Sequence, residues 1–274
     1  MEGAIEVLHL KLFFPSKNTF PSISTTGSRC ELMCKHCLGF YLKDMVDASN
    51  EGLYQCCMKA KENGAKGALL SGGSNSDGMV PYDLEDLQRC LSIKDFITNL
   101  HLGLVDEIKR QYKGANKVSV DLPPSDNVIR NIYNLKENTM EDYFSMLELL
   151  EEEKINYAPH LCVGLDRGRI SGEEKVLERL ESFSSEQLVI LTLKRTPNAS
   201  ATKNRLEISE YEKILKKARD RFKYLSLGCM RDREREKEKL WLYFDKIAWP
   251  SKIIKDEMQK NGIVCQIYDT CCSV

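Results

Sequence analysis

The chain has 274 residues, of which 42% are hydrophobic and 30% charged, and its formal net charge is −1. This balance suits a globular enzyme of α/β-barrel size and excludes a global positive field that would attract nucleic acid or an anionic membrane. No apolar run approaches the roughly 18 residues that span a bilayer, and no secretion signal precedes the first segments. We therefore expect a cytoplasmic protein, with no nucleic-acid or membrane partner, whose eleven cysteines serve metal or redox chemistry rather than disulfides.

Short apolar segments alternate with longer amphipathic ones along the chain. The expected strands are Ser22–Thr26, Gly67–Ser71, Leu100–Leu104, Lys117–Leu122, His160–Leu165, Leu188–Leu193, Tyr224–Leu227 and Gly262–Ile267. The expected helices are Asp44–Asn63, Tyr82–Ile97, Val105–Tyr112, Asn127–Lys154, Gly172–Phe183, Ser209–Arg221 and Asp232–Lys260. The balanced charge run Arg231–Lys239 is typical of a solvated helix face. Repeated β-α units predict one α/β domain over 1–274, a TIM-like (β/α)8 barrel that is closed or else irregular and partial, with a cysteine-bearing tail at 265–274.

Three cysteines lie close together directly after the first expected strand. Cys30, Cys34 and Cys37 stand in the run Ser-Arg-Cys-Glu-Leu-Met-Cys-Lys-His-Cys, with the spacing Cys-x3-Cys-x2-Cys. Three thiolates on one loop suit three irons of a cubic iron–sulfur cluster and leave the fourth iron open for chemistry. The alternative is a zinc knuckle, which usually has four protein ligands, and no second pair of similar spacing follows.

This spacing, with His36 just before the third cysteine, resembles the radical S-adenosylmethionine (SAM) superfamily. The resemblance implies two cofactors, a [4Fe–4S] cluster on Cys30, Cys34 and Cys37 and a SAM molecule on the open iron. It also implies an enzyme that takes one electron from a low-potential donor such as ferredoxin, cleaves SAM reductively and abstracts hydrogen from an unactivated carbon. The fold implied is a barrel of the radical SAM type.

Further SAM contacts are expected at the ends of other strands. Ser71, Gly72 and Gly73 end the second expected strand, where the superfamily has a glycine-rich turn that binds the SAM amino group; the alternative is an ordinary tight turn. Asp121 is a candidate for the SAM ribose hydroxyls or a plain turn residue. His101 is a candidate SAM or substrate contact or a core histidine.

The other cysteines raise the question of a second cluster. Cys229 follows the seventh expected strand, and Cys271 and Cys272 follow the eighth. In a closed barrel these strands are neighbours, so the three thiols would meet, with Cys265 as a possible fourth, and hold an auxiliary iron–sulfur cluster. The alternative is a frayed tail with incidental cysteines. The remaining thiols stand in apolar contexts typical of burial, at Cys56, Cys57, Cys90 and Cys162.

Scattered segments resemble a narrower group, the archaeal radical SAM proteins of the two-subunit lipoyl synthase type, which are related to biotin synthase. The matching stretches are Pro21 to Met45, Leu69 to Pro81, His101 to Glu107, Pro159 to Gly164, Leu227 to Arg231 and the terminal double cysteine. Leu38 and Asp232 depart from this pattern, which commonly has glycine and proline there.

The narrower resemblance implies a sulfurtransferase activity. In it, sulfur from the auxiliary cluster enters an octanoyl chain on a lipoyl-carrier protein, and a paralogous radical SAM subunit shares the work. The alternatives are a radical SAM enzyme without sulfur insertion (a methylase or a cofactor-maturation enzyme), a non-catalytic cluster-binding partner subunit, and a zinc-binding structural module.

Overall fold

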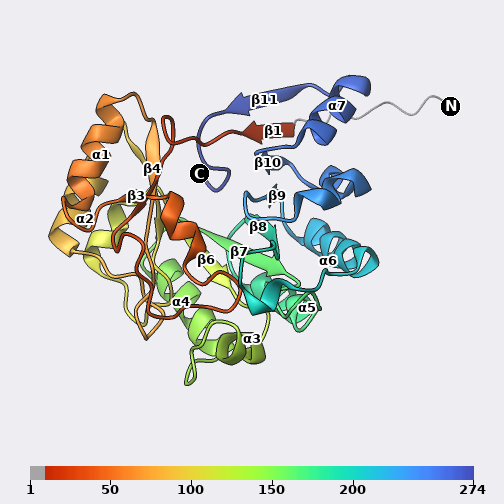
Figure 1. Cartoon of the computed structure of the whole chain (residues 1–274), viewed down its shortest axis with the longest axis horizontal. Helices are drawn as coiled ribbons and strands as arrows, with labels where there is room; N and C mark the ends of the chain where they lie inside the picture. The colour runs from red at the N-terminus through yellow and green to blue at the C-terminus, as the bar shows by residue number, and fades with distance from the viewer. Residues whose placement is uncertain (1–9) are drawn as a thin grey trace.

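A computed structural model describes residues 10–274, so positions 1–9 of the expected domain lie outside the described residues. It contains one eleven-stranded sheet, in which every neighbouring pair is parallel (Figure 1). The strand order is β11-β1-β10-β9-β8-β7-β6-β5-β4-β2-β3. The strands are β1 Leu10–Phe13, β2 Ser22–Ser24, β3 Val46–Asp47, β4 Gly67–Ser71, β5 Ile97–His101, β6 Lys117–Leu122, β7 Tyr157–Val163, β8 Gln187–Thr192, β9 Tyr224–Leu227, β10 Lys246–Ala248 and β11 Cys265–Tyr268.

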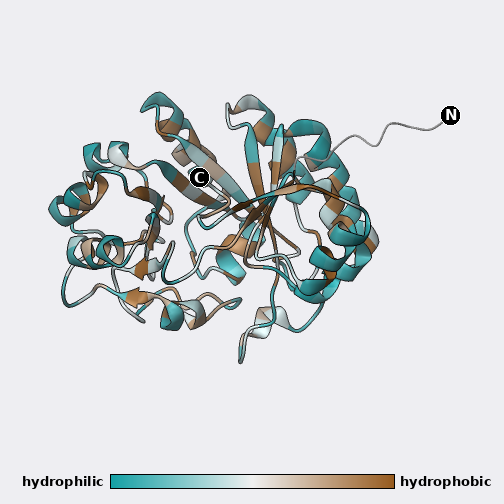
Figure 2. Ribbon diagram, turned by 90° about the horizontal axis from the view of Figure 1, so that it is seen from above, coloured by the Kyte–Doolittle hydropathy of each residue, from teal (hydrophilic) through white to brown (hydrophobic). Residues whose placement is uncertain are grey.

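The sheet curves into a half-barrel whose edges, β11 and β3, do not pair with each other. A closed eight-stranded barrel is therefore wrong, and the irregular, partial form is the one observed. Figure 2 shows apolar strands at the centre and helices around them whose outer sides are hydrophilic. The helices are α1 Leu53–Glu62, α2 Leu84–Leu91, α3 Asp126–Asn131, α4 Met140–Glu152, α5 Glu173–Arg179, α6 Ile208–Arg221 and α7 Lys252–Lys260. No helix within 10–274 is both long and apolar enough to cross a membrane.

The main core lies between the sheet and these helices. Ile23, Leu70 and Leu100 are fully buried on neighbouring strands, and Leu147 and Ile214 are fully buried on α4 and α6. The start of α2 is fixed by an N-cap residue. The Asp83 side chain accepts hydrogen bonds from the backbone N–H groups of Glu85 and Asp86 in the first turn of this helix. Because all strands run the same way, their carboxyl ends share one rim, which is where loops build sites in such folds.

The region expected as one helix at 232–260 differs most from expectation. It contains two short 3₁₀ helices, η5 (Arg233–Glu238) and η6 (Leu240–Tyr243), then β10 and α7. The expected solvated face at 231–239 is only partly observed. Arg233, Glu234, Lys237 and Lys239 are exposed, but the Arg231 and Glu236 side chains are only 2% and 3% exposed and pair with each other. The Arg231 guanidinium also donates to the backbone carbonyls of Gly228, Ala248 and Trp249, and so ties together the ends of β9 and β10.

Two other expected helices also differ. The stretch expected at 127–154 is split into α3 and α4 by a turn around Asn134, whose φ is +64°. The helix expected at 105–112 is instead an irregular loop followed by a 3₁₀ turn, η2 (Arg110–Gly114). Both interruptions shorten the covering layer on the outside of the sheet without changing the order of the strands.

The C-terminal tail is shorter than expected, because 265–268 form the edge strand β11. Residues 269–274 then turn inward to the middle of the molecule (Figure 1). Asp269 pairs with Lys66 before β4 at 2.8 Å, and the Cys271 sulfur lies 3.6 Å from the Asn99 side-chain nitrogen on β5. The tail therefore joins the two ends of the open sheet through side-chain contacts, on its concave side.

Candidate cluster and cofactor site

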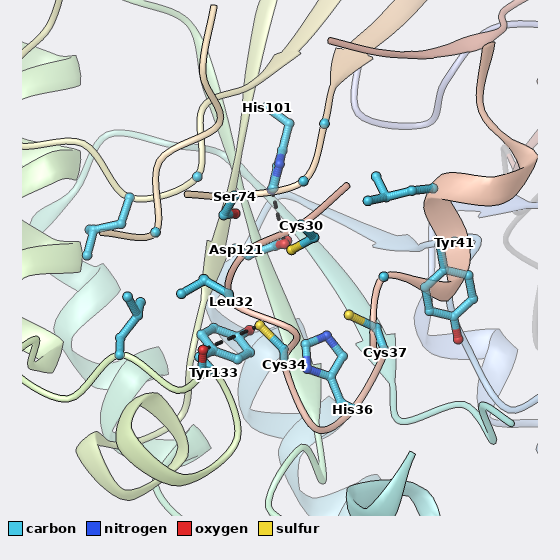
Figure 3. Close-up of a pocket in the computed structure, with 18 of the residues that line it drawn as sticks. Cys30, Leu32, Cys34, His36, Cys37, Tyr41, Ser74, His101, Asp121 and Tyr133 are labelled. Carbon is cyan, nitrogen blue, oxygen red and sulfur yellow. Dashed lines mark hydrogen bonds and ion pairs between the residues drawn. The ribbon is translucent and has the colours of Figure 1, made fainter. Parts of the chain in front are cut away.

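The three cysteines of the first motif lie on the loop between β2 and η1 (Phe40–Asp44), at the carboxyl rim of the sheet. Their sulfurs point into one cavity of about 180 Å³ (Figure 3). The same cavity is lined by several other residues singled out from the sequence, namely His36, Gly72, Gly73, His101 and Asp121. The structure thus brings the cysteine loop, the glycine turn and both polar candidates into one place.

The cysteine loop and the glycine turn are packed directly on each other. A Cβ atom on Gly73 would lie 2.0 Å from the Arg29 carbonyl oxygen and 2.6 Å from the Cys30 Cβ. The Gly73 N–H donates to Thr26 Oγ1 at 2.7 Å, and the Glu31 N–H donates to the Ser74 carbonyl at 2.9 Å. Glycine is needed at 73 because two backbones approach closely there, which a tight turn alone would not require.

The loop itself is held in an unusual conformation. Met33 and Leu38 have positive φ angles of 44° and 51°, in the left-handed region that disfavours branched side chains. Leu38 is the position where the resembling proteins commonly have glycine, and the backbone here keeps the glycine-like conformation. Leu38 therefore adopts a backbone conformation that glycine adopts at lower cost.

The thiols of the loop influence one another. A hydrogen bond from Cys34 and, to a smaller extent, His36 together lower the pKa of the Cys37 thiol to about 4, against the effect of burial. The same hydrogen bond and burial raise the pKa of Cys34. At neutral pH, the pair therefore shares one proton, and a thiolate, the form that binds metals, is already present.

The residues around the cysteine loop fit a cubic iron–sulfur cluster. Within 10–274, no three Cys, His, Asp or Glu side chains are arranged to hold one ion in common. A cubic cluster binds each thiolate through a different iron and does not need the sulfurs to meet at a point. His36 lines this cavity, and its buried Nδ1 has no hydrogen-bond partner among the described residues. The buried Thr25 Oγ1, 2.6 Å from where a Cβ on Gly72 would lie, also has none. Soft ligands, the close glycine turn and unpaired polar atoms are all consistent with a bound group.

His101 and Asp121 form a polar pair in the same cavity. His101 Nε2 lies 3.1 Å from an Asp121 carboxylate oxygen (Figure 3). His101 Nδ1 lies 3.3 Å from the Ser71 hydroxyl. Burial lowers the pKa of His101, but the Asp121 carboxylate more than offsets this and raises it above its ordinary value. Burial likewise raises the pKa of Asp121, and the charge and hydrogen bond of His101 outweigh it, giving about 2. Asp121 thus remains a carboxylate at any physiological pH.

A second cavity of about 120 Å³ adjoins the first and shares His36, Tyr41, Asp121 and Tyr133 with it. Its further lining comes from the carboxyl ends of β6, β7 and β8 and is mostly apolar, with Leu122, Cys162, Leu165, Leu191 and Leu193. Cys162 was expected to be a buried core thiol, but it borders this cavity. The two cavities together place an apolar space directly beside the cysteine loop.

The second set of cysteines is arranged differently from expectation. β9 and β11, which precede Cys229 and the tail cysteines, are not neighbours, because β10 and β1 lie between them. The inward turn of the tail nevertheless returns Cys271 and Cys272 to the interior. Burial raises the pKa of Cys229, and the charge of Cys271 raises it further. Cys265 begins β11 and packs on the core instead.

The tail thiols are coupled in the same way as the first set. A hydrogen bond from Cys272 lowers the pKa of Cys271 to about 6. Cys271 Sγ also lies 3.6 Å from the Ser273 hydroxyl, which lies 3.2 Å from His160 Nε2. The frayed-tail alternative is therefore wrong for the conformation of residues 271–273, which make specific contacts.

Several residues of the site gave no signal in the sequence. Tyr133, Tyr143 and Leu135 reach the first cavity from α4 and from the segment after α3, and the Cys34 thiol lies 3.5 Å from the Tyr133 carbonyl. These side chains reach the site through contacts between segments that are about 100 residues apart in the chain. Gly103 was detectable in principle, as a glycine directly after a strand. Its φ is +71°, and a Cβ there would lie 2.2 Å from the Gly78 carbonyl.

Comparison with solved structures identifies the fold. The chain is similar to methylornithine synthase (PylB), with a TM-score of 0.60 and 12% sequence identity over 93% of this chain and 82% of that one. The two share a fold. SuiB of Streptococcus suis is a weaker match, with a TM-score of 0.47 and 11% identity over 96% of this chain and 50% of that one. No family model matches the sequence, and no curated protein is detectably similar to it in sequence.

Proposed function

We propose that the chain is a radical SAM enzyme, in which Cys30, Cys34 and Cys37 hold a [4Fe–4S] cluster and SAM binds beside it. The observation that carries the proposal is the direct packing of the cysteine loop on the glycine turn, where Gly73 has no room for a Cβ. When bound, the cluster and SAM supply a one-electron reductive cleavage that removes a hydrogen atom from an unactivated carbon.

The protein's own part is to bind and orient. Gly72 and Gly73 line the cavity, and their backbone can approach the amino acid portion of SAM closely, while Ser71 contacts His101 behind them. Asp121 offers an ionised carboxylate for hydroxyl groups, and His101 keeps it ionised. The apolar walls of the second cavity limit the entry of water and leave room for a carbon chain beside the cysteine loop.

The finer proposal is a subunit of the two-subunit lipoyl synthase type. It would insert sulfur into an octanoyl chain on a lipoyl-carrier protein, with a paralogous radical SAM subunit as partner and ferredoxin or a similar donor as reductant. The proximity of Cys229, Cys271 and Cys272 supports an auxiliary cluster as the sulfur source. A radical SAM enzyme without sulfur insertion is the second candidate, since the same residues satisfy it without any use of the tail.

Anaerobic iron and sulfide content, with Mössbauer spectra and an assay for 5′-deoxyadenosine, tests both levels. The variants are the Cys30/Cys34/Cys37→Ala triple, the Cys229/Cys271/Cys272→Ala triple and Cys90→Ala, a matched control whose thiol is buried on α2. About eight irons in the wild type and about four in either triple variant support two clusters. About four in the wild type and none in the first triple variant retain the radical SAM proposal and contradict sulfur insertion. No iron, or no 5′-deoxyadenosine from an iron-loaded wild type, contradicts the enzyme proposal.

A further inference from the structure

The opposite end of the sheet holds a third cavity, far from the cysteine loop in the fold. It has a volume of about 490 Å³ and lies at the N-terminal ends of the strands. Lys117 and Lys246 are the first residues of β6 and β10, and Lys11 is the second residue of β1. Lys11 and Lys246 are register partners on adjacent strands, so their side chains point to the same face. Three ammonium groups therefore line one space.

These lysines are held by neutral groups. The Lys246 ammonium donates to the Gln187 side-chain oxygen at 3.0 Å and to the Cys272 carbonyl at 3.3 Å, and Lys117 donates to Asn156 at 2.6 Å. Among the described residues 10–274, no ion pair within 4.0 Å joins an Asp or Glu carboxylate to any of these three ammonium groups, and the last residue, Val274, also lines the cavity. Glu186 also borders the cavity, but its carboxylate is paired with the exposed Lys223 at 3.0 Å.

This arrangement is electrostatically unfavourable as it stands. Burial lowers the pKa of Lys117, and the charge of Lys246 lowers it further. Lys11 and Lys246 are register partners in the same lining, so three like charges share one space. Ammonium groups that share a cavity and repel one another cost free energy, which a bound anion would recover.

We propose that this cavity binds the diphosphate group of a small phosphorylated molecule. Ammonium groups act as point charges for phosphate oxygens, and three of them match an anion with more than one charge. Neutral groups for the remaining phosphate oxygens are present around the same space, at Asn156, Ser184, Ser185 and Gln187. The site stands on different residues from the cysteine loop and holds whether or not the chain is a radical SAM enzyme.

Occupancy of this site is coupled to the C-terminal tail. The Gln187 amide donates to the Cys272 carbonyl at 2.9 Å, and Lys246 reaches the same oxygen. The next residue, Ser273, contacts His160 at 3.2 Å on the concave face of the sheet. An anion that fixes Lys246 and Gln187 therefore also fixes the tail that carries Cys271, so that binding at one end of the strands stabilises the interior of the half-barrel.

Titration calorimetry on the full-length, anaerobically isolated protein tests the proposal with sulfate, phosphate, diphosphate and ADP as probes. The variants are Lys117→Met, Lys246→Met and the control Lys252→Met, whose exposed ammonium pairs with Asp256 on α7. We expect diphosphate to bind the wild type and the control equally, and about tenfold or more weakly in Lys117→Met and Lys246→Met. Hydrogen exchange of the backbone at 269–274 should slow when diphosphate is bound.

The outcomes separate clearly. Equal affinities for ADP and diphosphate mean that the diphosphate group suffices, and a higher affinity for ADP means that a nucleotide is the source. Sulfate binding as tightly as diphosphate indicates an adventitious ion only and overturns the proposal. An unchanged affinity for diphosphate in Lys117→Met also overturns the proposal, and this result can be read even if Lys246→Met fails to fold. The absence of binding at millimolar diphosphate overturns it as well.

Discussion

The two ends of the parallel sheet are built in contrasting ways. At the carboxyl end, the cysteine loop and the glycine turn follow two neighbouring strands, β2 and β4, and touch directly. At the amino end, the lysine cavity draws Lys11, Lys117 and Lys246 from strands more than a hundred residues apart and is partly floored by the tail. The first kind of site is visible in the sequence as a spaced motif, whereas the second has no local signature.

The largest expected effect is at Arg231, where the carboxyl end also depends on a long-range contact. Arg231→Met leaves Glu236 buried without its partner and should lower the free energy of unfolding by about 3–5 kcal/mol. Denaturant unfolding of the single variant, of Arg231→Met/Glu236→Met and of the exposed-pair control Lys252→Met measures this. The double variant should recover much of the loss. Similar losses in the free energy of unfolding for Arg231→Met and Lys252→Met would contradict a stabilising role of the buried Arg231–Glu236 pair.

Gly73→Ala tests the direct contact of the two local motifs. The added methyl group meets the Arg29 carbonyl and Cys30, and overpacking of this kind typically costs about 1–3 kcal/mol. Iron retention and SAM binding should fall together, because the same displacement moves the cysteine loop. Gly64→Ala is the control: no atom lies within 4 Å of its Cβ position, although its φ of +91° adds backbone strain. Normal iron and SAM binding in Gly73→Ala would show that the motifs are not coupled.

The His101–Asp121 pair can be tested because the shift in the pKa of His101 should change sign when the Asp121 charge is removed. In the wild type, the pKa of His101 should exceed its ordinary value of 6.5, because the Asp121 charge outweighs burial. In Asp121→Asn, only burial remains and the pKa should fall below 6.5. Histidine NMR titration of protein prepared without iron, with His101→Gln for assignment, gives both values.

The pair also makes a pH-dependent contribution to stability. The contribution of His101 to the free energy of unfolding is fully present at pH values below the pKa of histidine in the unfolded chain. It is lost as the pH rises through the pKa of His101 in the folded protein. The Asp121 share is lost as pH falls toward its folded pKa of about 2. The two shares overlap in mildly acidic solution, where the stability difference between wild type and Asp121→Asn should be greatest. A difference that grows steadily into alkaline solution would contradict the pairing.

The smallest effect is expected at the joint between tail and sheet. Lys66→Met removes the exposed ion pair with Asp269, and such pairs contribute about 0–1 kcal/mol to stability. The thermal midpoint should therefore scarcely change, while hydrogen exchange at 269–274 should become faster. Asp269→Asn should act in the same way, and Lys252→Met should not. An unchanged exchange rate in both variants would show that the other tail contacts suffice.

Strand positions were largely predictable because each expected strand is a compact apolar run. Gly67–Ser71, Lys117–Leu122 and Tyr224–Leu227 were predicted with their observed bounds. Lys246–Ala248 was missed because three residues between charged helical patterns are too few to show a strand period. With β1 and β3 also missed, the sequence pattern suggested eight strands and a closed barrel, where the structure has an open sheet.

For the site, the cysteine loop, the glycine turn, His101 and Asp121 were all predicted as candidates, and the structure places them in one cavity. Their positions followed from the rule that parallel strands share a carboxyl end. The burial of Arg231 and the contacts of Tyr133 could not be predicted. Both depend on which distant segments pack against them, and the sequence alone does not record this.

The open sheet gives the half-barrel a seam that a closed barrel lacks. The edge strands β11 and β3 do not pair, and the tail after β11 instead contacts Lys66 before β4 and Asn99 on β5. Separation along this seam would leave every strand ladder intact, so its cost is that of one exposed ion pair and a few buried side-chain contacts rather than of backbone hydrogen bonds. The half-barrel can thus open along its flank, whereas a closed barrel is accessible only at its two ends.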